Sequence, residues 1–284
     1  MPNKEVYVDV KPEMAAQAVT VFGCVQEVRD LVALRFVILQ DREGSIQVTV
    51  PRKRLSSEVL LKSDALQKRY SVGVKGLVKK TDMTPRGIEV VPKEIRIFGT
   101  AEPQLPIDIT GKTSAKLDAR LDARALDLCQ EENISIFKVR HTAAEAIRGF
   151  LFERGFLEVH TPRLIASATE GGAALFRVKY YDREAFLAQS PQLYKEELVM
   201  SLEKVFEMGP FFRAEESHTS LHSSEFTSVD VEEAFADAED VMHLLEQLML
   251  HVCRAVKEKC KRDLAVLKCR VKVPELPLQR LKYD

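Results

Sequence analysis

The sequence predicts an α+β protein of two domains, an N-terminal five-stranded β-barrel and a C-terminal domain of strands and long helices. Two observations predict this class. Short β-branched and apolar runs follow one another over residues 1–103, whereas apolar residues recur at helical spacing from Ser135 onward. The length of 284 residues suits two domains of ordinary size.

The N-terminal part contains five strand-like segments and one helical segment. The strands are expected at residues 19–28, 35–40, 45–50, 70–79 and 87–98. The tetrapeptide DREG between the second and third strands predicts a hairpin, and residues 57–67 have helical spacing. Five strands with a helix after the third match an OB barrel, in which the face of strands 2 and 3 commonly binds single-stranded nucleic acid.

After this barrel, residues 99–111 contain two prolines and two glycines and are expected to form a linker. An amphipathic helix is expected from Ser135 to Gly155. Further strands are expected at residues 156–159, 176–181, 186–188, 205–208 and 226–235, and helices at residues 193–202 and 238–261. Strands separated by long helices favour an α+β arrangement for this part.

Composition and charge exclude several classes of protein. Lys and Arg number 42 and Asp and Glu number 43, so the chain is not basic throughout, but residues 1–103 have a net charge of +4. That excess suits a module that binds a polyanion, although ordinary scatter of surface charge also explains it. The five cysteines include no C-x-x-C pair, and no apolar run is long enough for a membrane helix. We expect a cytoplasmic protein with reduced thiols, no membrane partner and no DNA partner.

Three segments of the second half carry motifs. Residues 155–162 read GFLEVHTP. Residues 169–172 read TEGG, and residues 186–195 read FLAQSPQLYK. Residues 205–216 read VFEMGPFFRAEE, and EFT follows at residues 225–227. In this order and spacing the segments resemble the class II aminoacyl-tRNA synthetases. Within class IIb they resemble the aspartyl-tRNA synthetases of the archaeal and eukaryotic type.

The resemblance implies a ligase that uses ATP to activate L-aspartate as aspartyl-adenylate and then transfers the aspartyl group to tRNA. It implies tRNA(Asp) as a partner, with tRNA(Asn) as a second one in relaxed members, Mg²⁺ bound with ATP, and a homodimer formed through residues 155–162. The implied organisation is an OB anticodon-binding domain over residues 1–103, a hinge over 104–130, and a partial class II catalytic domain with an antiparallel sheet over 131–284.

The resemblance also assigns residues to an aspartate pocket. Lys195 would pair with the side-chain carboxylate of the substrate, because a buried carboxylate without a cation is very costly. The related asparaginyl enzymes resemble QLYL or QLYQ at this point, so Lys195 favours aspartate over asparagine. Glu170 and Gln192 match positions that hold the α-ammonium group, and Ser190 would order the floor of the pocket.

A second set of residues is implied for ATP. Arg213 matches the arginine that contacts the α-phosphate and the substrate carboxylate, where a guanidinium lowers the repulsion between two anions and stabilises charge in the transition state. It is the catalytic residue that we expect. Glu215 would hold the adenine side of the nucleotide, His222 would lie near the terminal phosphates, and Phe226 would stack on adenine.

In the barrel, Phe36 and Gln47 match positions that read the central anticodon base, the aromatic ring by stacking and the amide by its edge. Gln26 and Pro85 match positions at which archaeal members that charge one tRNA differ from those that charge two. Pro85 resembles the relaxed type and Gln26 matches neither type, so the choice of tRNA stays open. A core aromatic is the alternative for Phe36.

The chain also departs from the family pattern. Leu221 stands where a phosphate-binding arginine is expected, and no G-x-G-x-x-R occurs. The sequence is therefore expected to be truncated before the third motif, with the acidic Mg²⁺ ligand outside it and no metal ligand within it. A paralogue or fragment that binds tRNA and dimerises without activating an amino acid is the alternative. A free asparagine synthetase on the same catalytic fold is a weaker one, because that type lacks the anticodon domain.

Overall fold

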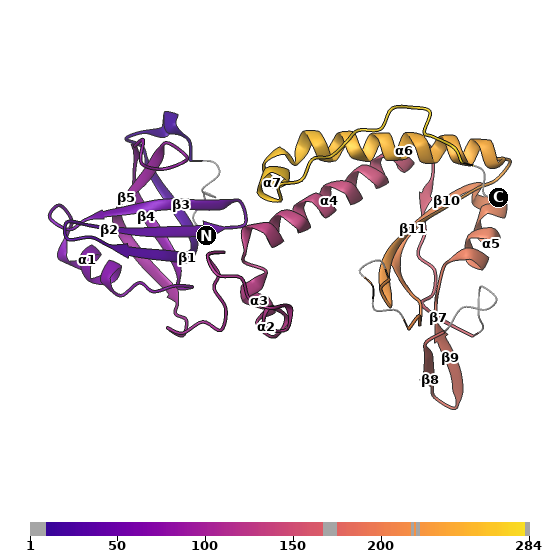
Figure 1. Ribbon diagram of the computed structural model, residues 1–284, viewed down its shortest axis with the longest axis horizontal. Helices are drawn as coiled ribbons and strands as arrows, with labels where there is room; N and C mark the ends of the chain where they lie inside the picture. The colour runs from indigo at the N-terminus through magenta and orange to yellow at the C-terminus, as the bar shows by residue number, and fades with distance from the viewer. Residues whose placement is uncertain (1–9, 167–174, 217–218, 220–221, 282–284) are drawn as a thin grey trace. The chain divides into compact units, whose positions relative to one another are not determined.

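The computed structural model describes residues 10–166, 175–216, 219 and 222–281. The chain divides into two compact units, residues 1–137 and residues 138–284 (Figure 1). In the first unit five strands close into a barrel in the order β1-β2-β3-β5-β4. These strands are β1 (Ala18–Asp30), β2 (Leu34–Asp41), β3 (Gly44–Pro51), β4 (Ser71–Lys80) and β5 (Ile88–Gly99). The predicted OB barrel is confirmed.

The connections follow the sequence signals. β2 and β3 form an antiparallel hairpin in which Asp41 pairs with Gly44, as the DREG tetrapeptide predicts. β3 and β5 are the parallel pair that the barrel order requires. A β-bulge between Val25 and Glu27 shifts the alternation along β1, so that Val25 and Val28, three residues apart, both contact the core. Gln26 is the extra residue of this bulge.

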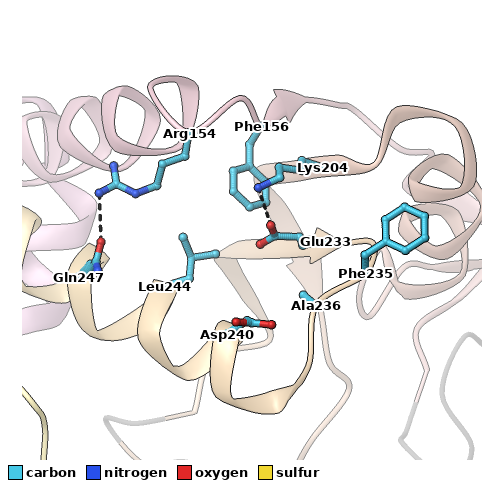
Figure 2. A pocket seen from close by; sticks show the side chains of 9 residues that line it. All are labelled: Arg154, Phe156, Lys204, Glu233, Phe235, Ala236, Asp240, Leu244 and Gln247. Carbon is cyan, nitrogen blue, oxygen red and sulfur yellow. Dashed lines mark hydrogen bonds and ion pairs between the residues drawn. The ribbon is translucent and has the colours of Figure 1, made fainter.

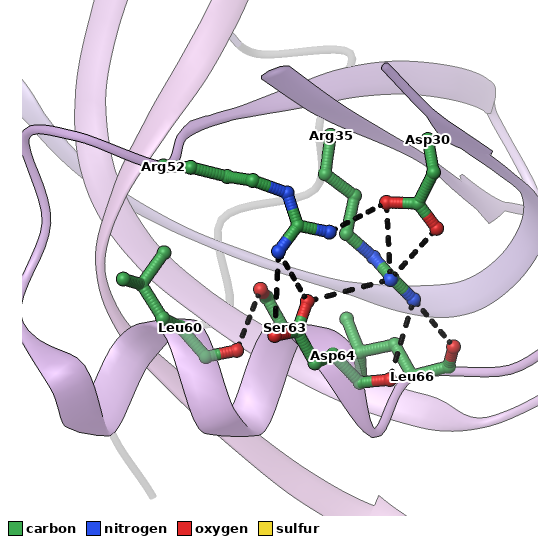
Figure 3. A network of polar contacts seen from close by, with 7 residues as sticks. All are labelled: Asp30, Arg35, Arg52, Leu60, Ser63, Asp64 and Leu66. Atoms are coloured by element: carbon green, nitrogen blue, oxygen red, sulfur yellow. Dashed lines mark hydrogen bonds and ion pairs between the residues drawn. The ribbon is translucent and has the colours of Figure 1, made fainter. Parts of the chain in front are cut away.

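The helix α1 (Ser57–Asp64) follows the third strand, as expected, and is fastened to the barrel by a buried arginine (Figure 3). Arg35 of β2 donates to Asp30 Oδ2 at 2.9 Å and to the backbone oxygen of Leu66 at 3.1 Å. Arg52, which follows β3, pairs with Asp30 Oδ1 at the end of β1 at 2.8 Å and with Asp64 Oδ1 at the end of α1 at 3.1 Å. These contacts hold α1 beside the β2 and β3 end of the barrel.

The short helices that were not predicted are α7 (Lys261–Val266), η2 (Pro12–Met14), α2 (Leu117–Asp122) and α3 (Arg124–Asp127). The last two are too short to be stable by propensity alone, and side-chain contacts hold them. Asp127 is fully buried, accepts from Arg120 Nε at 2.7 Å and also pairs with Arg124. The hydrogen bond from Arg120 lowers the pKa of the Asp127 carboxyl.

The second unit contains two three-stranded sheets. One has the order β11-β10-β6, in which β10 (Lys204–Phe212) and β11 (Glu225–Glu233) are antiparallel, as expected, and β6 (Leu157–Glu158) is parallel to β10. The other has the order β7-β9-β8, formed by β7 (Leu164–Ile165), β9 (Arg183–Leu187) and β8 (Arg177–Tyr180). The helix α5 (Gln192–Leu202) precedes β10.

Two long helices cover the first sheet, α4 (Glu131–Phe152) and α6 (Ala238–Lys259), followed by α7 (Lys261–Val266). α4 begins earlier than Ser135, because Glu131 and Glu132 suit the positive end of a helix dipole. Phe150, Phe156 and Phe206 are buried together, with Leu244 of α6 against them. α6 ends at Lys259 rather than at residue 261. Among the described residues, no helix is long and apolar enough to cross a membrane.

Candidate functional site

The antiparallel pair β10–β11 brings together two of the residues assigned to ATP. Phe211 pairs with Phe226 across the two strands, and Arg213 follows directly after β10. The backbone amide of Arg213 donates to the Ser224 oxygen at 3.1 Å, which extends the strand pairing past the end of β10. As a result the Arg213 guanidinium lies 5.4 Å from the centre of the Phe226 ring. A flat cation and an aromatic face at this separation suit a phosphate and a purine of one nucleotide.

The other two residues assigned to ATP also lie near each other. Nε2 of His222 is 4.0 Å from Glu215 Oε2, and Nδ1 of His222 is 2.6 Å from Thr219 Oγ1. Both side chains are about half exposed. Leu221, where the sequence departs from the family, lies outside the described residues.

The lysine assigned to the substrate carboxylate is buried at the start of α5. Lys195 is 3% exposed, and its Nζ lies 3.5 Å from both Asp230 Oδ1 and Glu232 Oε2. Both acids belong to β11, and they share the parity of Phe226 along that strand, so all three side chains project from one face. Asp230 Oδ2 is buried and has no hydrogen-bond partner in the described part of the chain. Two carboxylates facing one ammonium make a polar site with capacity for another donor.

Sequence reasoning missed Asp230 and Glu232. Their signal is the alternation of Phe226, Asp230 and Glu232 along a strand that follows the FRAE motif, which places charged side chains on the same face as an aromatic.

Two other residues of the expected aspartate pocket lie at the N-terminus of the same helix. Ser190 is 8% exposed, and its Oγ accepts a hydrogen bond from the Gln192 backbone amide at 3.3 Å. The Gln192 side chain donates to Glu196 Oε1 at 2.8 Å. Glu170, assigned to the α-ammonium group, lies outside the described residues, as does the whole TEGG segment. The structure thus gathers Ser190, Gln192 and Lys195 on one short stretch.

A buried ion pair links the segment after β6 to β10. Glu207 is completely buried, and its Oε1 accepts from Arg163 Nη2 at 2.5 Å. Thr161 donates to the same carboxylate through its backbone amide at 3.0 Å and through its hydroxyl at 2.7 Å. The Arg163 guanidinium also lies 4.2 Å from the centre of the Phe211 ring. This cluster fixes Phe211, the cross-strand partner of Phe226.

A groove of about 830 Å³ on the barrel contains both residues assigned to the central anticodon base. Phe36 of β2 and Gln47 of β3 line it. Gln47 Nε2 donates to Thr49 Oγ1 at 3.2 Å and to Glu89 Oε2 at 3.4 Å. The amide nitrogen is therefore occupied, and the carbonyl Oε1 is the Gln47 atom that these bonds leave for a ligand. Four cations share the groove: Arg29, Lys53, Arg54 and Lys79.

Gln26 and Pro85 are not among the residues that line this groove. Gln26 lies at the bulge of β1, and Pro85 is exposed in the turn between β4 and β5. Glu89 was not singled out from the sequence. It is 5% exposed in the groove, accepts from Thr49 Oγ1 at 2.7 Å, and pairs with Lys79 Nζ at 3.3 Å.

A second hollow, of about 430 Å³, lies where β11 meets α6 and holds none of the residues assigned from the sequence (Figure 2). The Lys204–Glu233 pair at 2.5 Å and the hydrogen bond from Arg154 to Gln247 at 3.2 Å border it. Phe235 at its edge is fully exposed. In the described part of the chain, no group of three or more His, Cys, Asp or Glu residues could hold a metal ion.

Comparisons with known proteins match both units. Residues 116–284 match the family of class II tRNA synthetases (D, K and N), and residues 19–98 match the OB-fold nucleic acid binding domain. Among curated relatives, an aspartate–tRNA(Asp/Asn) ligase of Methanopyrus kandleri is 48% identical, and an aspartate–tRNA(Asp) ligase of Pyrococcus abyssi is 43% identical. Each match covers 97% of this chain and 64% of the relative, so the chain spans about two thirds of their length.

Solved structures of the same kind are also similar. The asparaginyl-tRNA synthetase of Pyrococcus horikoshii in complex with asparaginyl-adenylate is 32% identical, with a TM-score of 0.87 over 94% of this chain and 61% of that one. The aspartyl tRNA synthetase of Entamoeba histolytica is 26% identical, with a TM-score of 0.79 over 93% of this chain and 57% of that one.

Proposed function

This chain belongs to the class II tRNA synthetases of the D, K and N group, and from that membership we propose that it functions in an aspartate–tRNA ligase. The proposed reaction activates L-aspartate with ATP to aspartyl-adenylate and transfers the aspartyl group to tRNA. The relatives named as aspartate–tRNA ligases, at 43–48% identity, support this reaction class.

One observation carries the choice of amino acid. Lys195 is buried, and its ammonium is the only cationic group within ion-pair distance of Asp230 and Glu232 among the described residues. A substrate with an anionic side chain gains a charge-assisted bond to this ammonium, whereas an amide side chain gains a weaker one. The two acids hold the ammonium in place before the substrate binds, and such preorganisation favours affinity.

Activation requires two anions, the substrate carboxylate and the α-phosphate, to approach each other. Arg213, beside Phe226, is the residue that we propose to lie between them. Phe226 and Glu215 would lie on the adenine side of the nucleotide, and His222 near its terminal phosphates. The attacking carboxylate is already ionised at neutral pH, so no side chain has to remove a proton from it. The side chains need only orient the two substrates and offset their negative charge. Mg²⁺ would accompany ATP.

The barrel supports a tRNA partner. Phe36 offers an aromatic face, Gln47 an acceptor on the edge of its amide, and the four cations of the groove offer contacts to phosphates. We propose that this groove binds the anticodon of tRNA(Asp). Pro85 favours acceptance of tRNA(Asn) as well, and relatives of both kinds are similar to the chain. A homodimer formed through residues 155–162 is part of the proposal.

The test is aspartate-dependent exchange of pyrophosphate into ATP by the 284-residue chain. Arg213→Ala is the test variant and Arg177→Ala, on the exposed β8–β9 hairpin, is the matched control. We expect exchange in the wild type and in the control, and a loss of at least 100-fold in Arg213→Ala, since electrostatic groups of this kind contribute about two to three orders of magnitude. Absence of exchange in the wild type, with tRNA still bound, would favour a tRNA-binding module and overturn the proposed activity of this chain.

A further inference from the structure

The end of α6, with α7 and the segment after it, is the most cationic stretch of the second unit. Residues 254–272, called the basic end below, contain eight Lys or Arg and two Asp or Glu, although the whole chain has a net charge of −1. Charges on a surface are screened beyond about 8–10 Å at physiological salt. A ligand at this place therefore meets the local excess of positive charge rather than the near-neutral total.

A small apolar cluster holds the basic end together. Val256, Cys260 and Leu264 are buried, and Val271 from the returning segment packs against them. Lys257 and Lys261 neighbour the first two of these residues in sequence, while Arg270 and Lys272 flank Val271. All four of these cations are exposed. The shared core brings the cations of the helices and of the returning segment to one end of the unit.

Two of the cations lie on one side of α6. Arg254 and Lys257 are three residues apart in this helix, whereas Lys261 begins α7, after the non-helical Cys260. Lys259 lies on the other flank, where it pairs with Glu145 of α4 at 3.1 Å. Within the described ranges, no acidic group lies within ion-pair distance of Arg254, Lys257, Lys261, Arg270 or Lys272. The helix dipole favours Lys257 and Lys259 in the last turn but gives no reason for Arg254 or for the cations after residue 260.

The composition of the basic end indicates which part of a polyanion it recognises. No aromatic residue occurs between residues 254 and 272, so the basic end offers no aromatic ring on which a base could stack. Lysines and arginines without aromatics contact phosphates and position a nucleic acid without reading its sequence. The barrel groove differs, because Phe36 lies among its cations.

We propose that the basic end binds the phosphate backbone of a double-stranded stem of the tRNA. This inference rests on the proposed function, which supplies the RNA. The two sites contact different parts of the tRNA. The barrel groove reads the unpaired anticodon bases, and the basic end adds salt-sensitive affinity for a stem of any sequence. Each phosphate contact releases counterions, so it contributes about one unit to the slope of log affinity against log salt concentration.

The experiment compares two pairs of substitutions in the full chain. The test pair is Lys257→Gln with Lys261→Gln, and the matched control is Lys179→Gln with Arg183→Gln on the exposed β8–β9 hairpin. Glutamine keeps helix propensity and removes only the charge. Binding is measured by fluorescence anisotropy between 50 and 200 mM KCl, with three probes: a tRNA(Asp) transcript, its isolated anticodon stem-loop, and a 12-base-pair RNA duplex. Thermal melts show that each variant is folded.

We expect the test pair to weaken binding of the transcript and the duplex about tenfold at 100 mM salt and to reduce the salt slope by about two, while the control pair leaves both unchanged. Anticodon stem-loop binding should depend on Phe36 far more than on the basic end. An unchanged slope in the test pair, or an equal loss in the control pair, would overturn the inference. Failure of the wild type to bind the anticodon stem-loop would count against the proposed function, whereas loss of duplex binding in the test pair would still support the basic end as an RNA site.

Discussion

Arg163 and Glu207 form a buried ion pair in which Nη2 of the arginine lies 2.5 Å from Oε1 of the carboxylate. The pair joins the segment after β6 to the middle of β10, and Thr161 supplies two further donors to the same carboxylate. Because the Arg163 guanidinium also stacks on Phe211, the pair fixes the strand that leads to Arg213. The first and third motifs of the sequence thus meet in one polar cluster, and Glu207 lies opposite Asp230 in the pairing of β10 with β11.

Removing the cation of this pair should destabilise the second unit. We expect Arg163→Met to lower the free energy of unfolding by about 3 kcal/mol, because Glu207 would remain as a buried carboxylate without its cation. Urea unfolding followed by circular dichroism measures the change. The matched control is Arg177→Met, whose pair with Glu184 is exposed and 3.7 Å long, so it should cost less than about 1 kcal/mol. Equal effects of the two substitutions would show that the buried Arg163–Glu207 pair contributes no more stability than an exposed ion pair.

Gly209 lies beside the same pair and provides a second, steric test. A Cβ at Gly209 would lie 2.3 Å from Arg163 Nη2, so Gly209→Ala has to displace the guanidinium. We expect a loss of about 2 kcal/mol in unfolding free energy, within the range for an overpacked site. Gly149→Ala on α4 is the control, since nothing lies within 4 Å of its Cβ, and alanine should stabilise that helix by about 0.5–1 kcal/mol. A stabilised Gly209→Ala protein would contradict this account of Arg163.

Some parts of the fold follow from the sequence and others do not, for a physical reason. β2 and β3 could be predicted because short runs of apolar and β-branched residues and the DREG turn are local signals. α3 could not, because it depends on Asp127, whose partners Arg120 and Asn133 lie in neighbouring segments. The site shows the same division. Lys195 and Arg213 lie in recognisable motifs, whereas Asp230 and Glu232 matter because β11 turns them toward Lys195, and pairing of that kind is not visible in one strand alone.

Acid should loosen the contact between the barrel and the segment after it. Hydrogen bonds from Arg29 and Lys112 lower the pKa of Glu27 from 4.5 to about 2. A carboxyl whose folded pKa is below its unfolded pKa stabilises the fold above the unfolded value, and this stabilisation is lost as the pH falls from about 4.5 toward 2.

We therefore expect the free energy of unfolding of Glu27→Gln to be lower than that of the wild type by about 1 kcal/mol at pH 7. This figure is reduced because both partner cations are exposed. Near pH 2 the two proteins should be equally stable. Unfolding curves at several pH values provide the measurement. Glu58→Gln, at the exposed pair with Lys62, is the control and should show only a small difference. A constant gap between Glu27→Gln and the wild type across this pH range would refute the assignment.

The barrel groove should depend on Phe36 through stacking and not through the core. Phe36→Leu keeps an apolar side chain but removes the aromatic face, so we expect affinity for an anticodon stem-loop to fall about tenfold or more, given about 1–3 kcal/mol per stacked base. Phe22→Leu is the matched control, because Phe22 packs against Phe98 and does not line the groove. Fluorescence anisotropy with the stem-loop measures both. If the two substitutions weaken binding equally, Phe36 acts only as a core residue.

Lys195 allows a direct test of amino-acid recognition. Lys195→Met removes the ammonium, so an anionic substrate meets the carboxylates of Asp230 and Glu232 without the cation that offsets them in the wild type. We expect aspartate affinity to fall at least 100-fold, equivalent to about 2.7 kcal/mol, while ATP binding changes little, as measured by isothermal titration calorimetry. Lys204→Met, which removes an ammonium paired with Glu233 away from the site, should leave aspartate affinity intact. Lys195→Gln should reduce the preference for aspartate over asparagine, because a neutral amide offers the two side chains similar hydrogen bonds; an unchanged preference would mean that other residues select the substrate.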